Sequence, residues 1–248
     1  MNNAFAWNAL KSSEERRLYG AIRRAIEQGP PAVPLGDTDP ETFSRVFGAV
    51  LKDGPGLFQA DGKWRIAPNE GRRYAVLHIA FTPEEIRAGR REMADIAARF
   101  APLMERSVPE RIRAVFDWLL ENTSYGFTET DGQNSYDALI RRRAVCKGIS
   151  KAFQYLMDSL GVCCTLAEGT LDGVGRHVWN VVEIDGAFYH VDLCMGYRRF
   201  DGLFEGTGRS GRYRCFLVGD ETLGRTHRRT EGIGPRIICT ADYGRRSL

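Results

Sequence analysis

The chain has 248 residues, of which 43% are hydrophobic and 27% charged, and its formal net charge at pH 7 is +3. A chain of this length buries a sizeable core, either as one large domain or as a catalytic domain with an extension. The small net charge gives no argument for a nucleic-acid partner, and no apolar run approaches the roughly 18 residues that predict a membrane span. The first residues lack a signal-peptide pattern, so we expect a cytoplasmic protein.

The six cysteines are expected to be reduced thiols, because a chain of this size without an export signal needs no disulfide framework. They are Cys146, Cys163, Cys164, Cys194, Cys215 and Cys239. No two of them form a Cys-x-x-Cys pair, the histidines lack zinc-ligand spacing, and no acidic loop has calcium-ligand spacing. We therefore expect no metal and no other cofactor.

Residues 1–80 predict a mainly helical accessory region without recognisable chemistry. Helices are expected around Glu14–Glu27 and over Glu41–Lys52, because a glycine- and proline-rich breaker follows each of them. A short hairpin is expected over Leu57–Ile66, turning at Asp61-Gly62.

Residues 81–248 are expected to form the catalytic domain. An alternating apolar pattern predicts a strand over Arg73–Phe81 at its start. Two helices follow, introduced by capping-box residue types and a proline at Thr82-Pro83 and again at Ser107-Val108-Pro109, and the second runs to about Asn122. Both helices are interpreted as scaffold.

Cys146 lies in the first turn of a predicted buried helix. Apolar residues recur at helical spacing from Val145 to Leu160, and Gly161 stands where a C-terminal glycine would end the helix. The positive end of the helix dipole favours a thiolate, which makes Cys146 a candidate nucleophile. Gly148 would leave space for a substrate backbone. Taken alone, Cys146 also fits simple packing, since free cysteine is often buried.

A hairpin further along the chain supplies the partners that a nucleophile needs. Strands are predicted over His177–Ile184 and Ala187–Leu193, on either side of the strong turn signal Asp185-Gly186. A two-residue loop would make His177 and Asp192 diagonal neighbours on one face, whereas a loop changed by one residue would send Asp192 to the other face. The carboxylate can then bind one imidazole nitrogen and leave the other for a thiol, as in a cysteine triad.

Other residues of the hairpin have less specific interpretations. Trp179 shares the face of His177 and could line an acyl channel, although it fits the core as well. Asn180 points to the opposite face and is expected to make structural hydrogen bonds. The remaining histidines are expected to be structural or to face solvent: His78, His190 and His227.

Three segments of this chain together resemble a known family. Val145–Leu156 resembles the nucleophile helix of bacterial transglutaminase-like proteins, His177–Asn180 their histidine strand and Tyr189–Asp192 their aspartate strand. The resemblance covers about residues 107–230. Softer matches are Ser135–Leu139 before the cysteine, and Cys215–Asp220 with His227 after the triad.

This resemblance implies an α+β, papain-like fold in which Cys146, at a helix N-terminus, faces an antiparallel sheet. Activities of the family include acyl transfer from glutamine amides to amines, peptide hydrolysis and removal of glycans from asparagine, and several members are binding modules without the triad. Leu193-Cys194-Met195 departs from the family, where threonine and tryptophan are more usual, so the pocket beside the triad is expected to differ.

We therefore expect Cys146 to attack a peptide or protein amide and form a thioester, with His177 as base and Asp192 as orienting group. Transfer to an amine, hydrolysis and cyclisation all stay open. The backbone N–H of Cys146 and the side chain of Tyr136 are candidate oxyanion donors. The alternatives are a peptide-binding or assembly module with a vestigial triad, and a reversible thiol sensor formed with Cys194.

Overall fold

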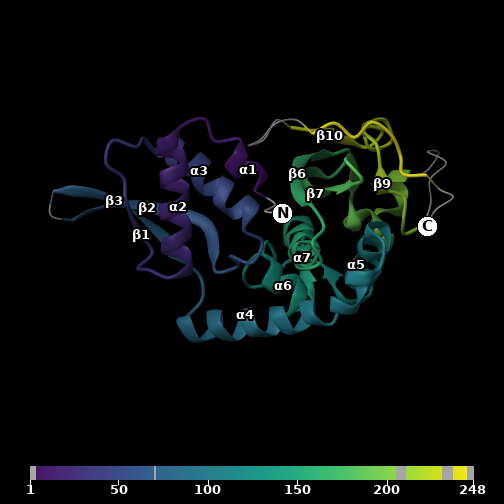
Figure 1. The fold of residues 1–248 in the computed structure, drawn as a ribbon, viewed down its shortest axis with the longest axis horizontal. Helices are drawn as coiled ribbons and strands as arrows, with labels where there is room; N and C mark the ends of the chain where they lie inside the picture. Colours follow the sequence, from purple (N-terminus) through teal and green to yellow (C-terminus); the bar gives the residue numbers. More distant parts are fainter. Residues whose placement is uncertain (1–3, 70, 205–210, 231–236, 245–248) are drawn as a thin grey trace. The chain divides into compact units, whose positions relative to one another are not determined.

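The computed structural model describes residues 4–69, 71–204, 211–230 and 237–244. Their backbone forms two compact units, one ending at Ala88 and the other beginning at Gly89, so that the boundary falls within helix α4 (Pro83–Ala98) (Figure 1). None of the helices in these residues has the length and apolar composition that crossing a bilayer requires.

The first unit packs helices and a small antiparallel sheet around one apolar core. Its helices are α1 (Phe5–Asn8), α2 (Ser13–Glu27) and α3 (Pro40–Asp53), and its strands lie in the order β1 (Ala32–Pro34), β3 (Arg72–Ile79) and β2 (Ala60–Asn69). The carboxylate of Asp53 joins the helices, because it accepts hydrogen bonds from the backbone N–H groups of Ala6 (2.9 Å) and Trp7 (2.8 Å) and from the Tyr19 hydroxyl (3.2 Å).

The predicted hairpin over Leu57–Ile66 is wrong. A single strand, β2, runs through this segment and pairs with β3 instead. The pairing register shifts between Ala60 and Trp64, and Gly62 in this stretch has a φ of +86°. An aspartate-glycine pair suits a positive φ in a β-bulge as well as in a tight turn, which explains the misinterpretation.

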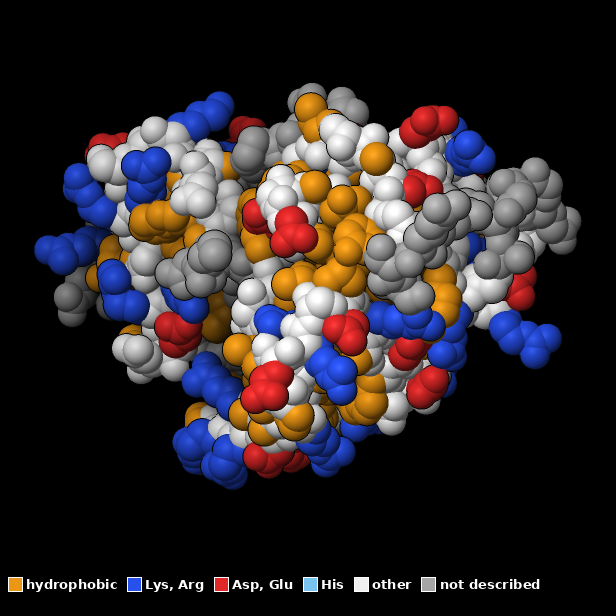
Figure 2. All heavy atoms as spheres, turned by 45° about the vertical axis from the view of Figure 1, so that its right-hand side comes forward, with side chains coloured by type: hydrophobic (Ala, Val, Ile, Leu, Met, Phe, Trp, Pro, Cys, Tyr) orange, Lys and Arg blue, Asp and Glu red, His pale blue; other side chains and the backbone are white. Residues whose placement is uncertain are grey.

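The second unit is an α+β structure, as the sequence predicts. Its helices and 3₁₀ turns are the end of α4, η1 (Ala101–Glu105), α5 (Val108–Asn122), α6 (Ser135–Leu139), α7 (Cys146–Ser159), η2 (Leu193–Gly196), η3 (Arg198–Phe204) and α8 (Asp220–Leu223). Helix α5 begins with the predicted capping box of Ser107 and Glu110. On the face drawn in Figure 2, basic and acidic side chains are intermixed.

An antiparallel five-stranded sheet forms the other layer of this unit. Its order is β10 (His227–Arg229), β6 (Cys164–Leu171), β7 (Gly175–Ile184), β8 (Ala187–Val191) and β9 (Phe216–Val218). A separate parallel pair joins β4 (Ser124–Tyr125) to β5 (Arg143–Ala144).

The β7–β8 hairpin has the predicted two-residue loop. Ile184 pairs with Ala187 and Asn180 with Val191, and the turn residues Asp185 (φ 51°) and Gly186 (φ 80°) both have the positive φ of a type I′ turn. Strand β8 ends at Val191, one residue before Asp192, so the ladder stops just short of the aspartate.

Helix α7 packs on this sheet through an apolar face in which Ile149, Ala152, Phe153 and Leu156 are fully buried. Polar contacts set its position: the Ser150 hydroxyl donates to the Val178 carbonyl (3.1 Å), and the Asn180 amide donates to the Ser150 carbonyl (3.0 Å). The N-terminal end of the helix is thereby held at strand β7, which carries His177.

Candidate active site

Cys146 is the first residue of α7, and its side chain is partly exposed. The N-cap residue, Val145, supplies no side-chain hydrogen bond to the helix. The positive end of the helix dipole therefore acts on the thiol without a competing cap and favours its thiolate.

At Gly148 the chain's own backbone leaves no room for a side chain. A Cβ atom at this position would lie 2.3 Å from the carbonyl oxygen of Gly132 and 2.9 Å from that of Asn134. The space that the sequence suggested for a substrate backbone is thus filled by this loop, and Gly148 allows the first turn of α7 to pack against it.

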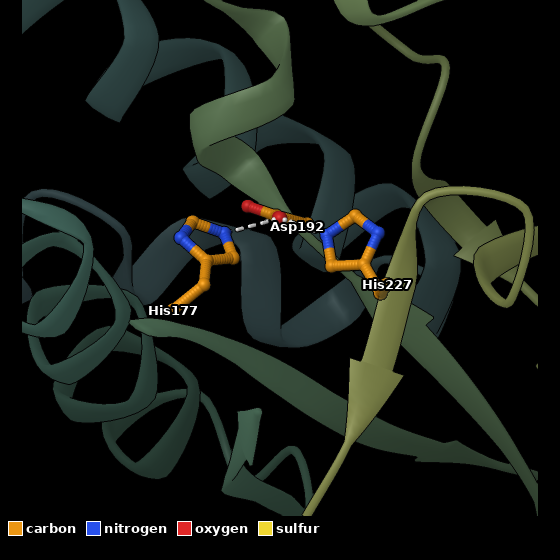
Figure 3. A group of neighbouring side chains, drawn as sticks. All are labelled: His177, Asp192 and His227. Carbon is orange, nitrogen blue, oxygen red and sulfur yellow. Dashed lines mark hydrogen bonds and ion pairs between the residues drawn. The ribbon is translucent and has the colours of Figure 1, made fainter. Parts of the chain in front are cut away.

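His177 and Asp192 form a buried hydrogen-bonded pair. The Nε2 atom of His177 lies 2.7 Å from Oδ2 of Asp192, and the two residues are only 2% and 1% exposed (Figure 3). The other carboxylate oxygen accepts from the Cys194 backbone N–H at 2.9 Å, which fixes the orientation of the carboxylate. Because Nε2 is used in this way, Nδ1 is the nitrogen of His177 that remains for Cys146.

The electrostatics of the three residues favour a charged pair. Burial alone would raise the pKa of Cys146, but the hydrogen bond and charge of His177, with the Val178 backbone N–H, outweigh it and lower the thiol pKa. Burial likewise opposes the charged form of His177, yet Asp192 raises the imidazole pKa to about 10. The two histidines beside Asp192 outweigh its burial and hold the carboxyl pKa well below its usual range.

A second histidine binds the same aspartate. The Nε2 atom of His227 lies 2.9 Å from Oδ2 of Asp192, and its Nδ1 atom is 2.8 Å from the Thr226 hydroxyl. Figure 3 shows Asp192 between the two imidazoles. His227 is only 3% exposed, so it does not face solvent. In the sequence, only its place in the family resemblance pointed to it, because the contact depends on the edge strand β10.

Close packing of the sheet brings His227 into place. Strand β10 pairs with β6, and Gly169 of β6 lies opposite His177 of β7. A Cβ atom on Gly169 would lie 2.2 Å from the carbonyl oxygen of Arg228 and 2.9 Å from the ring of Trp179. Position 169 therefore needs a glycine, because both strand β10, which carries His227, and the Trp179 ring approach it closely.

Trp179 lies in the core behind His177. Its ring is fully buried and stacked against the His177 imidazole, with ring centroids 6.1 Å apart and an interplanar angle of 19°. Its indole N–H donates to Nδ1 of His190 (3.0 Å), whose Nε2 atom donates to Asp220 (2.8 Å). This placement matches the core interpretation of Trp179, and it gives His190 the structural role that the sequence suggested.

Two tyrosines lie near the nucleophile helix in different ways. The ring of Tyr136 lies under the Arg141 guanidinium at 5.4 Å. Tyr125, which the sequence did not single out, pairs in the β4–β5 ladder with Ala144, two residues before Cys146. Cys194 is buried, and both its burial and the charge of Asp192 raise its thiol pKa, so it is a poor source of thiolate.

Two clusters in the described residues have the composition of metal sites: His177 with Asp192 and His227, and His190 with Asp220 and Cys239. Hydrogen bonds explain both clusters. Asp192 is ionised and accepts from two imidazoles, so each Nε2 atom carries a proton and has no lone pair for a metal. Since indole is only a donor, Nδ1 of His190 is the acceptor and Nε2 holds the proton toward Asp220. Neither donor set fits a metal without a change of tautomer.

An α+β fold that brings a helix-terminal cysteine to a histidine–aspartate pair on an antiparallel sheet defines the papain-like and transglutaminase-like class. Residues 94–193 match the family model described as the Transglutaminase-like superfamily. Over these residues the chain is therefore similar to the transglutaminase-like superfamily. The match supports a cysteine-dependent catalytic role for the chain in general terms.

Similarity to individual proteins is distant. No curated protein matches the chain. Among solved structures, it is similar to a TGase (13% identity, TM-score 0.39, covering 53% of this chain and 44% of that chain). It is also similar to a candidate cysteine protease from Cytophaga hutchinsonii (13%, TM-score 0.36, 53% and 61%) and to menin (14%, TM-score 0.36, 84% and 39%). The chain thus matches less than two thirds of the length of each.

Proposed function

We propose that this chain transfers acyl groups from peptide or protein amides through a thioester on Cys146. The acceptor is an amine in a transglutaminase-like reaction or water in a peptidase reaction. The observation that supports the proposal most directly is the buried His177, held by Asp192 at 2.7 Å through Nε2 while Nδ1 remains for the thiol. This is the base and orienting group that a cysteine nucleophile needs.

The charge state supports nucleophilic attack at neutral pH. Asp192 raises the pKa of His177 to about 10 and His177 lowers that of Cys146, and both shifts favour a thiolate beside an imidazolium. Asp192 stabilises the imidazolium and keeps its ring in place. The enzyme therefore needs no further base to generate its nucleophile.

In the acylation step, the Cys146 sulfur forms a bond to the carbonyl carbon, and the carbonyl electron pair moves onto oxygen. When this tetrahedral intermediate collapses, the C–N bond breaks and the Nδ1 proton of His177 passes to the leaving amine. A neutral His177 then accepts a proton from the incoming amine or water as the acceptor attacks the thioester. The cycle ends with the thiolate and imidazolium restored.

Alkylation of the thiol tests the nucleophile directly. Cys163 is an internal control, because it is also partly exposed but burial and Glu183 raise its pKa to about 12. At pH 7 we expect iodoacetamide to label Cys146 at least about 10-fold faster than Cys163, as read by peptide mass spectrometry. His177→Ala should slow labelling of Cys146 alone. Equal rates of Cys146 labelling in the wild type and in this variant would rule out the proposed triad.

A second assay separates the possible reactions. Dimethylcasein serves as the protein amide and a fluorescent primary amine as the acceptor. Incorporation of the amine that is lost in Cys146→Ala indicates transfer, whereas cleavage of the protein without incorporation indicates hydrolysis. Fast labelling of Cys146 without a thioester, transfer or cleavage would favour the alternative of a binding module with a vestigial triad.

A further inference from the structure

A small cavity lies between helix α4 and the end of α6, within the second unit. Its volume is about 250 Å³, below the range of about 300–1,000 Å³ that is usual for drug-sized ligands, so it suits a ligand the size of an amino acid. One wall is formed by residues at helical spacing on one face of α4 and just beyond it: Glu92, Asp95, Ile96 and Arg99. The other wall is formed by Leu139, Ile140 and Arg142.

Arg142 brings an unused hydrogen-bond donor to this cavity. Its Nη1 atom is buried, yet it has no hydrogen-bond partner among the residues that the structure describes. The guanidinium lies 4.7 Å over the ring of Trp118. The Arg142 carbonyl accepts from the N–H (2.8 Å) and the hydroxyl (3.1 Å) of Ser124, and the backbone keeps a φ of +58°, which side-chain-bearing residues rarely adopt. A strained, well-held arginine with a free buried donor is suited to binding an acceptor on a ligand.

The guanidinium of Arg99 lines the same cavity. Burial and the charge of Arg99 both lower the pKa of Arg142, so the charged form of Arg142 is destabilised in the free protein. Within the described part of the chain, neither arginine forms an ion pair that would offset this effect. A carboxylate bound in the cavity would offset it, because guanidinium groups bind carboxylates through two parallel hydrogen bonds.

Glu92 and Asp95 add two negative charges, so the lining carries as many negative as positive charges. These carboxylates also lack ion-pair partners among the described residues. From the rise of 1.5 Å per residue, they start about 6–10 Å before Arg99 along the helix axis. Such a lining repels a ligand with several negative charges, whereas a ligand with one carboxylate and one ammonium group pairs with both signs.

Apolar side chains separate the two kinds of charge. Ile96 lies between the acids and Arg99 on the face of α4, and Leu139 and Ile140 line the opposite wall. Methylene groups placed between the charged ends of a ligand would be removed from water against these side chains. Charge, spacing and apolar surface therefore all fit the same kind of molecule.

We propose that this cavity binds a small ω-amino acid, whose carboxylate pairs with the two arginines and whose ammonium group pairs with the two acids. The methylene chain of the ligand lies along the apolar side chains between them. The site is separate from the chemistry proposed for Cys146, and the inference does not rest on that function.

Ligand-observed NMR titrations of the full chain test this binding. 6-Aminohexanoate is the probe, because its two charged groups are joined by a flexible methylene chain. Hexanoate and hexylamine each carry only one of the two charges on a similar chain. We expect saturable binding of 6-aminohexanoate that is at least about 10-fold tighter than that of either analogue.

Two variants locate the ligand. Arg142→Lys keeps the charge but loses the planar fork, and it should weaken binding of 6-aminohexanoate at least about 10-fold. Arg99→Gln should weaken binding as well, and because this side chain is exposed, its loss should not disturb folding. Arg91→Gln is the matched control: Arg91 is exposed on the same helix but lies outside the cavity, so its loss should leave the affinity unchanged. Thermal melting curves show whether each variant is folded.

The other outcomes overturn the inference. The absence of saturable binding would mean that the cavity holds only solvent. Equal affinities for hexanoate and 6-aminohexanoate would show that the acids contribute nothing and would exclude an ω-amino acid as the specific ligand. Unchanged affinities in Arg142→Lys and Arg99→Gln would place the ligand elsewhere. Slow labelling of Cys146 would contradict the proposed function alone, so the two ideas fail separately.

Discussion

The Nε2 atom of His227 lies 2.9 Å from the Oδ2 atom of Asp192, the same oxygen that holds the proposed base His177. A single carboxylate oxygen thus accepts from two imidazoles supplied by two different strands, β7 and β10. The second histidine shares the negative charge and restricts the carboxylate. His227 is therefore expected to position Asp192 without touching substrate.

Removing His227 should affect both folding and acylation. His227→Ala leaves a cavity and a buried carboxylate oxygen with one donor fewer, so we expect the free energy of unfolding to fall by about 1–3 kcal/mol. Urea denaturation measures this change. His78→Ala is the matched control, because His78 is exposed and pairs with Asp61 at the surface. Similar small effects of the two substitutions would show that the Asp192–His227 contact contributes little.

The thiolate–imidazolium pair predicts an unusual pH dependence of stability. The raised pKa of His177 stabilises the fold fully below the unfolded value of about 6.5, and this contribution is lost as the pH rises through about 10. The lowered pKa of Cys146 acts in the opposite sense: its contribution is present above the unfolded value of about 8.5 and is lost as the pH falls through the folded pKa.

Above both the lowered pKa of Cys146 and the unfolded histidine value of about 6.5, and below about pH 8.5, the two contributions should offset each other, because the folded and unfolded chains then hold the same number of protons at this pair. We expect wild-type stability to change little across this window. In Cys146→Ala, where only the histidine contribution remains, stability should fall steadily with rising pH. Urea midpoints at closely spaced pH values distinguish the profiles; parallel curves would mean that the two groups are not paired as thiolate and imidazolium.

Gly169 is expected to tolerate no side chain. Gly169→Ala places a Cβ atom 2.2 Å from the Arg228 carbonyl oxygen, so strand β10 must shift and carry His227 with it. We expect a loss of about 1–3 kcal/mol of unfolding free energy, together with slower acylation of Cys146. Gly202→Ala, at an exposed position with open space for a Cβ atom, should leave both unchanged. An unchanged melting temperature in Gly169→Ala would contradict this close approach.

The indole N–H of Trp179 should matter beyond the size of its ring. Trp179→Phe removes the donor to Nδ1 of His190 and leaves that buried acceptor unsatisfied, at a cost of about 1–3 kcal/mol besides the cavity. A double-mutant cycle with His190→Phe isolates this hydrogen bond from the change of ring volume. Additive effects in the cycle would mean that the contact adds no coupling energy.

Chelation should leave the thiol chemistry intact. The tautomers that the hydrogen bonds impose on His177, His190 and His227 leave no free lone pair at the carboxylate-facing nitrogens. We expect equal rates of Cys146 labelling and acylation before and after dialysis against EDTA. Loss of both rates, restored by one added divalent cation, would show that one of these clusters holds a metal.

Local pattern was sufficient to predict the parts of the site that depend on short-range geometry. The spacing of apolar residues predicts α7 with Cys146 at its start, and the Asp185-Gly186 turn predicts the register that brings His177 to the face of Asp192. A two-residue turn fixes the register of its two strands, and because side chains alternate between faces, the register decides which residues share a face. The Asp185-Gly186 pair in this way brings together His177 and Asp192, which are 15 residues apart. The other aspartate-glycine pair, Asp61-Gly62, led to the wrong prediction of a hairpin, because the same two residues also suit a β-bulge.

What the sequence by itself determined was the chain order and the shared face of the proposed nucleophile, base and orienting group, since a helix terminus and a hairpin register are local properties. Only the tertiary structure decided which residues complete the site. Tyr125 lies close to the start of α7 because it pairs with Ala144, 19 residues further along the chain, and His227 reaches Asp192 through an edge strand that packs over Gly169. Such contacts depend on long-range pairing, whose partners no local pattern of turn, charge or period specifies.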